Sequence, residues 1–121
     1  MGLLLVIVAH ERGFFLMFDR AKELVMEDKQ KVKEISDLKV KAVEELSKLQ
    51  AEIRTLRVKV HELMELSDAK EDEIKKLHDR IVELESKMHR LRFSYMLQLR
   101  SILGPDKFKE LHKRPRSKED D

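Results

Sequence analysis

This chain of 121 residues has no cysteine, only three glycines and two prolines, and an aromatic content of 5%. Without cysteine it has no disulfide, no thiolate metal site and no cysteine nucleophile. It also lacks a glycine-rich phosphate loop and a Ser–His–acid set that a rigid pocket would hold, so we expect no enzymatic activity. The net charge is only +2 with both signs interspersed, whereas a dedicated nucleic-acid binder concentrates its basic residues in one stripe.

Charged residues, by contrast, make up 41% of the chain. A composition rich in Glu, Lys, Leu and Arg with helical periodicity is typical of long helices and coiled coils. The length allows one domain with a narrow apolar seam, and it is too short for a deep core that encloses an active site.

Apolar residues recur at heptad spacing in two series that mirror each other around a polar break at Asp68–Ala69. If the chain folds back there, each core position meets one whose residue number adds with its own to 137. Leu63 then faces Ile74, and the one polar layer agrees because Lys39 falls opposite Gln98. The pattern predicts an antiparallel helical hairpin. The first series is Ile35, Lys39, Ala42, Leu46, Leu49, Ile53, Leu56, Val60 and Leu63, and the second is Ile74, Leu77, Ile81, Leu84, Met88, Leu91, Tyr95, Gln98 and Ile102.

The expected fold class is therefore all-α: a long antiparallel hairpin flanked by short N- and C-terminal helices. After Gly13, apolar residues at helical spacing from 14 to 25 predict a short amphipathic helix. The first long helix should run from the carboxylates of residues 27–28 to about residue 66. The second should begin with a capping-box-like pair, Asp68 and Glu71, and run to residue 103. Gly104 and Pro105 should end it and open a last short helix.

The apolar surface widens toward the open end of this hairpin. Two helices alone cannot bury the extra residues, so the first helix, the last helix or a second copy of the chain must cover them. We expect a homodimer, with any remaining exposed patch serving as a binding surface. The extra residues are Val32, Leu38, Val43, Phe93, Met96, Leu97, Leu99 and Leu103.

Residues 1–9 form an apolar run that ends in Ala9 and is too short to span a bilayer. They resemble the second half of a secretory signal whose basic start is missing, and we interpret them as a truncated export signal. The alternatives are an arm that packs on the protein and a membrane anchor. We expect a single helical-hairpin domain over residues 10–113, a disordered polar tail over 114–121, and no stable membrane insertion.

Two short motifs lie at the ends of the predicted hairpin. Residues 26–30 keep an apolar first residue, an acidic residue and a glutamine, and residues 103–107 keep a leucine, a proline and an aspartate. In this order, around a hairpin with an arginine-bearing segment at 53–63, the chain resembles the Spy/CpxP group of periplasmic proteins, with its zinc-resistance-associated and heavy-metal-resistance relatives. That family carries a Leu-Thr-x-x-Gln motif twice; here the first copy has Glu27 for Thr, and the second lacks both Thr and Gln. The matching residues are Met26, Gln30, Leu103, Pro105 and Asp106.

The resemblance implies a cradle of two interlocked hairpins in the periplasm that acts as an ATP-independent chaperone, an envelope-stress modulator or a metal-responsive protein. As a chaperone it would bind unfolded or misfolded envelope proteins and need no cofactor. Apolar and basic side chains offer adaptable contact and long-range attraction to acidic clients. The residues we expect to bind clients are Phe14, Phe15, Phe18, Arg54, Arg57, Phe93 and Met96.

The basic residues raise a further expectation. Under the 137 register Arg57 falls opposite Arg80, and Lys59 falls opposite His78, which would form a basic stripe on one side of the hairpin. The alternative is an ordinary solvated face with acidic neighbours.

Two other functions stay open. A metal-binding resistance or sensor protein would use zinc or copper at His10, His61 and His89, although no histidine pair has the i, i+4 spacing of a helical zinc site. A structural coiled-coil interaction protein would bind no client at all.

Overall fold

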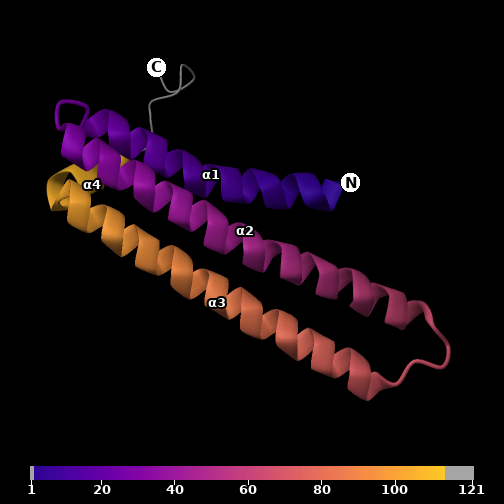
Figure 1. Ribbon diagram of the computed structural model, residues 1–121. Coiled ribbons are helices and arrows are strands. Elements are labelled where there is room, and N and C mark those ends of the chain that lie inside the picture. Colours follow the sequence, from indigo (N-terminus) through magenta and orange to yellow (C-terminus); the bar gives the residue numbers. More distant parts are fainter. Residues whose placement is uncertain (1, 114–121) are drawn as a thin grey trace. The chain divides into compact units, whose positions relative to one another are not determined.

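The computed structural model describes residues 2–113, with side chains from residue 13 onward, and these residues form four helices and no strand (Figure 1). The helices are α1 (Gly2–Leu24), α2 (Lys29–Glu65), α3 (Glu71–Leu103) and α4 (Pro105–Leu111). The expected all-α class, with two long helices flanked by two further ones, is confirmed. None of the helices in the described part is long and apolar enough to cross a bilayer.

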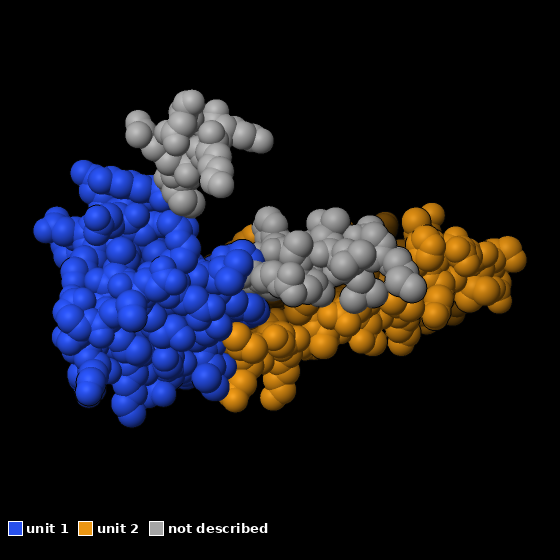
Figure 2. All heavy atoms as spheres, turned by 90° about the horizontal axis from the view of Figure 1, so that it is seen from above, with its two compact units in different colours: residues 1–41, 95–121 blue, residues 42–94 orange. Residues whose placement is uncertain are grey.

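The chain divides into two compact units (Figure 2). Unit 1 comprises Met1–Lys41 and Tyr95–Asp121, and it contains α1, α4, the beginning of α2 and the end of α3. Unit 2 comprises Ala42–Ser94, which is the rest of α2 and α3 with the turn between them. Unit 2 by itself is an antiparallel two-helix hairpin (Figure 1).

The two long helices begin in different ways. The Asp28 carboxylate accepts a hydrogen bond from the Lys31 backbone N–H at 3.1 Å, so Asp28 caps α2 as its sequence position suggests. The expected capping box at Asp68 is wrong, because α3 begins only at Glu71 and the Lys70 carbonyl accepts its first backbone bond. Three acidic residues in the first turn, 71–73, favour this start through the helix dipole.

Gly104 and Pro105 separate α3 from α4 as the sequence predicts. Gly104 has φ +85°, a left-handed conformation that glycine adopts at little cost, and Pro105 occupies the first position of α4. The Gly104 N–H still donates to the Arg100 carbonyl at 2.8 Å, so the last turn of α3 is satisfied before the chain changes direction.

The expected helix start after Gly13 is wrong, because α1 runs through this glycine from Gly2. A single glycine inside a helix costs about 1 kcal/mol relative to alanine, which lowers helix stability without breaking the helix. The interpretation of residues 1–9 as a truncated export signal stays a prediction, because their side chains lie outside the described part. The predicted disorder of residues 114–121 also lies outside it.

Unit 1 has a core built from all four helices. Phe18 and Ala21 form one buried face of α1, at the spacing expected of an amphipathic helix, and Val25, just after the helix, is buried as well. Helix α1 also contacts α4. Of the additional apolar residues on the long helices, Leu38, Leu99 and Leu103 are buried in this unit, and Leu111 of α4 is buried as well. Val32 and Met96 are only half-buried, and Leu97 is 51% exposed.

In unit 2 the apolar seam is less completely buried as it approaches the turn. Leu46 and Ile53 are almost fully buried. Closer to the turn, the seam residues are only half-buried. These half-buried residues are Leu56, Val60, Leu63, Ile74 and Leu77.

Two ion pairs define how the helices of unit 2 are aligned. An Arg57 guanidinium nitrogen lies 2.9 Å from a Glu85 carboxylate oxygen, and Arg80 lies 3.3 Å from Glu52. The residue numbers add to 142 in the first pair and to 132 in the second, five above and five below 137. Charged pairs flank the seam of a coiled coil on both sides, so this spacing confirms the predicted register.

Candidate functional site

The three phenylalanines of α1 that the sequence proposes for client binding differ in exposure. Phe18 is 0% exposed and belongs to the core of unit 1, so it offers no surface to a client. Phe14 and Phe15 are half-buried. The Phe14 ring contacts both others edge to face, with ring centroids 5.5 Å from Phe18 and 5.9 Å from Phe15. The cluster is therefore first a packing element that holds α1 in place.

Phe93 of α3 is the most exposed of the proposed aromatic residues, with 64% of its surface accessible. It lies on the side of α3 opposite the seam, since it follows Met88 by five residues and precedes Tyr95 by two. Its neighbours Lys87, His89 and Arg90 in unit 2 are exposed too. In unit 1, Met96 of the same helix is half-buried.

The arginines of unit 2 do not form the expected basic stripe. Arg57 pairs with Glu85, and Arg80 pairs with Glu52 and, at 3.2 Å, with Glu83. The 137 register holds for residues that face each other in the seam, whereas flanking residues meet five positions away on either side. Arg57 and Arg80 consequently lie on opposite flanks, each beside a carboxylate. Arg54 is exposed.

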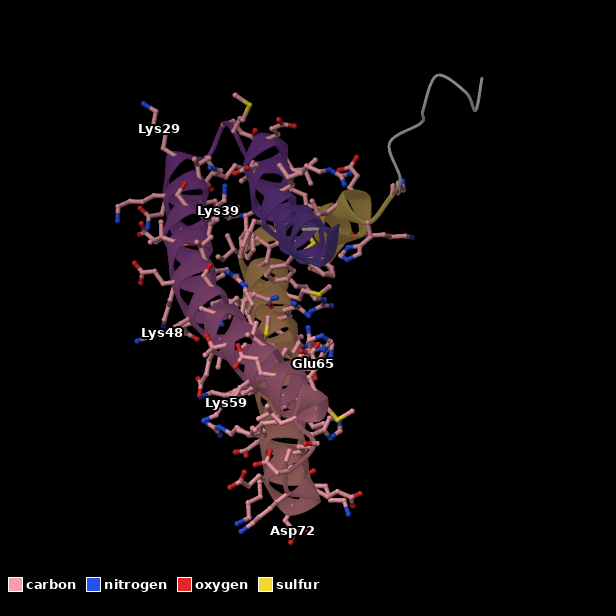
Figure 3. All side chains as sticks on the ribbon, turned by 90° about the vertical axis from the view of Figure 1, so that its right-hand side faces the viewer. Lys29, Lys39, Lys48, Lys59, Glu65 and Asp72 are labelled. Atoms are coloured by element: carbon pink, nitrogen blue, oxygen red, sulfur yellow. The ribbon has the colours of Figure 1, made fainter. Side chains whose placement is uncertain are left out.

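Lys39, the polar residue in the predicted seam, has a partner that the sequence did not indicate. Its ammonium lies 2.9 Å and 3.0 Å from the two carboxylate oxygens of Asp19 on α1, and Lys22 adds a contact at 3.3 Å. Figure 3 shows Lys39 between α2 and α1, in contrast to Lys48 on the outer side of α2. The hydrogen bond from Lys39 lowers the pKa of Asp19 below its ordinary value of 3.8, against a smaller opposing effect of burial.

The two motif segments are brought together in unit 1. The Lys107 ammonium donates to the Leu24 carbonyl and to the Glu27 carboxylate, each at 3.2 Å. A hydrogen bond from its own backbone and the one from Lys107 lower the pKa of Glu27. The link therefore joins the α1–α2 turn to the start of α4. Sequence reasoning missed Lys107, because a lone lysine in a short helix has no periodicity that points to its partner.

The matched motif residues themselves have varied environments. Leu103 is buried, whereas Met26 is 71% exposed. Gln30 is exposed and donates to Glu34 at 3.4 Å within α2. Pro105 and Asp106 occupy the first turn of α4.

The histidines proposed as metal ligands do not converge in the described part of the chain. His61 is highly exposed and lies 3.3 Å from Glu65, one helical turn away. His89 is exposed on α3, and the side chain of His10 lies outside the described residues. Between residues 13 and 113, no group of three or more His, Asp or Glu side chains is arranged to hold a metal ion.

Comparison with protein-family models, with curated proteins and with solved structures finds no match for this chain.

Proposed function

We propose that this chain is an ATP-independent chaperone of the bacterial periplasm, of the Spy/CpxP kind, that holds unfolded proteins against an exposed helical surface. The observation that carries this proposal is Phe93, which is 64% exposed on a stretch of α3 without acidic residues. In a chain with 41% charged residues, no Asp or Glu occurs from Lys87 to Leu103.

The client-binding surface that we propose consists of Lys87, His89, Arg90 and Phe93, all exposed and all in unit 2. An exposed aromatic ring offers apolar contact that many sequences satisfy. The basic groups beside it attract acidic segments over a longer range, and this attraction weakens as salt is added. Such a surface favours loose binding of many clients over tight binding of one.

The two segments that resemble the family motif are linked in unit 1, through the positions at which Glu27 and Lys107 replace the Thr and Gln of the motif. The segments that resemble the family motif, residues 26–30 and 103–107, are far apart in sequence and are connected through Lys107 and Glu27. Two degenerate copies of one motif would be expected to share a structural role, and here both contribute to closing the same end of unit 1.

The direct test is suppression of the aggregation of a denatured model protein, without nucleotide, at a near-stoichiometric ratio. Phe93→Ser should weaken suppression several-fold, and Arg90→Glu should weaken it most at low salt. Val82→Ser is the matched control, because Val82 is also exposed on α3 but stands beside Glu83. Phe18 is unsuitable for this test, since its substitution disrupts the core. Absence of suppression by the unmodified chain would refute the proposal.

We also propose that two copies of the chain pair. Near the turn of unit 2 the seam stays half-buried, and two further apolar residues, Met64 and Leu66, are 67% and 55% exposed. A second copy would cover this surface and lower its free energy in water. Sedimentation velocity should show a dimer that Met64→Lys with Leu66→Lys converts to a monomer. A monomer at every concentration would contradict the pairing and leave the aggregation assay to decide the chaperone function.

A further inference from the structure

Residues of α1 and α4, with the two residues that follow α4, line an open pocket of about 380 Å³ within unit 1. This volume falls within the range of about 300–1,000 Å³ that is usual for small-molecule sites. The residues that line it are Gly13, Leu16, Met17, Arg20, Leu111, His112 and Lys113.

The lining combines an apolar wall with a basic rim. Leu16, Met17 and Leu111 supply the apolar contacts, and Leu16 remains 51% exposed although it belongs to a packed helix. The rim carries Arg20 and Lys113, and no carboxylate of the described side chains, residues 13–113, lines the pocket.

Three contacts fix the residues around the rim. A guanidinium nitrogen of Arg20 donates to the Lys113 carbonyl at 3.3 Å, which joins α1 to the end of α4. The His112 Nδ1 lies 3.1 Å from the Phe108 carbonyl, one turn earlier, and its ring lies against the Phe108 ring with centroids 4.4 Å apart.

Another open pocket of unit 1 has a lining of different charge. It has about 440 Å³ between α2 and α3, and its apolar residues are Leu38 and Ile102. Glu34 and Asp37 stand at its rim with a single lysine, Lys41, so this pocket repels anions where the first attracts them.

We propose that the pocket between α1 and α4 binds a single-chain anionic amphiphile, with the acyl chain against Leu16, Met17 and Leu111 and the anionic group at Arg20 and Lys113. Apolar burial provides the affinity, and the charged rim selects the anion. This site shares no residue with the client-binding surface around Phe93, so it goes beyond the proposed chaperone function.

Gly13 offers a steric test of this site. An added Cβ would meet no atom within 4 Å, so the space beside Gly13 is free for a larger side chain. Gly13→Leu should fill part of the pocket. Gly13→Ala raises helix propensity by a similar amount and leaves most of the space open.

The experiment is a titration of the full chain with monomeric laurate, followed by calorimetry and by amide chemical shifts. Laurate should shift the signals of residues 13–20 and 111–113. Dodecyl maltoside has an alkyl chain of the same length without a charge, and it should bind about tenfold more weakly than laurate. Laurate should also bind the Arg20→Gln variant about tenfold more weakly than the unmodified chain. Each change removes one charge-assisted contact. Gly13→Leu should weaken laurate binding and Gly13→Ala should not. Lauroyl lysophosphatidylglycerol distinguishes a lipid source from a free fatty acid.

Three outcomes would overturn the proposal: no binding of laurate, equal binding of laurate and dodecyl maltoside, or equal affinity of the two Gly13 variants. Shifts confined to the region of Phe93 would also overturn it, since they would place the amphiphile on the client-binding surface. Aggregation suppression is measured on the same variants. Retained suppression in Gly13→Leu with lost laurate binding separates the two functions.

Discussion

Units 1 and 2 contain parts of the same two long helices, with the same heptad pattern, yet they bury it to different degrees. In unit 1, where α1 and α4 add further neighbours, Ile35 and Leu99 are 0% exposed. In unit 2 the seam residues nearest the turn, such as Leu63, are only half-buried. The heptad pattern therefore determines which residues face inward. Their burial decreases only toward the turn of unit 2, since Leu46 and Ile53 of the same unit are almost fully buried.

The largest effect that tests this comparison is expected from a cavity in unit 1. Phe18→Ala should lower the free energy of unfolding by about 3–5 kcal/mol, because it removes a fully buried ring from a packed core. Urea denaturation followed by circular dichroism measures this loss.

Two matched leucines sharpen the contrast. Leu99→Ala in unit 1 should cost about 2–5 kcal/mol, and Leu63→Ala in unit 2 only about 1 kcal/mol, because the partly exposed leucine loses less buried surface. Equal losses of unfolding free energy would mean that Leu63 is buried to the same degree as Leu99. Pairing of two copies would explain this result if the losses depend on protein concentration.

A smaller effect is expected at the junction that closes unit 1. Gly104→Ala should cost about 1–3 kcal/mol, since φ +85° with ψ 157° is a backbone conformation that essentially only glycine adopts. Gly13→Ala is the control within the same unit. It should instead stabilise the protein by about 0.5–1 kcal/mol, because Gly13 lies inside α1. Thermal unfolding should show a lower midpoint temperature for Gly104→Ala and a higher one for Gly13→Ala.

The ion pairs of unit 2 should contribute still less to stability. A double-mutant cycle of Arg57→Ala and Glu85→Ala should give a coupling of about 0.2–1 kcal/mol, because both side chains are about 40% exposed and water screens the pair. A coupling above this range would show that the pair is shielded from solvent, as pairing with a second copy would cause.

The smallest expected effect is the pH dependence of the Asp19–Lys39 pair in unit 1. Because the folded-state pKa of Asp19 lies below 3.8, its stabilising contribution is present above that pH and is lost as the pH falls through the folded-state value. The difference in unfolding free energy between the unmodified chain and Asp19→Asn should therefore shrink on acidification. If this difference stays constant as the pH falls, the effect of Asp19→Asn on stability comes from packing and not from the charge of Asp19.

Much of the fold could be predicted from the sequence because it depends on local or periodic signals. The heptads gave the register, and Gly104 with Pro105 gave the end of α3. The failures involve partners without periodicity. Lys39 contacts Asp19, and Lys107 contacts Glu27, only because α1 and α4 return to the same end of unit 1. No spacing in the sequence shows where a flanking helix will cross.

The sequence indicated which kinds of residue form the candidate site, but it did not indicate which of them are exposed. Phe18 and Phe93 have the same side chain, and the sequence proposed both for client binding. The structure buries the first and exposes the second, since Phe18 lies on the apolar face of α1 and Phe93 lies opposite the seam on α3. That distinction depends on which helix face finds a neighbour.

The two ion pairs that flank the seam of unit 2 also disfavour other alignments of its two helices. Heptads repeat every seven residues, so sliding one helix by one heptad would again bring apolar residues together and would cost the seam little. After such a slip in one direction Arg57 would meet Arg92, and Arg80 would meet Lys59, so attraction would turn into repulsion on both flanks. In the other direction His78 would replace the carboxylate opposite Arg57. In that direction Arg80 would meet Glu45 and keep an attractive partner, so only one flank would lose its ion pair. The two weak pairs thus penalise one of the neighbouring alignments more than the other.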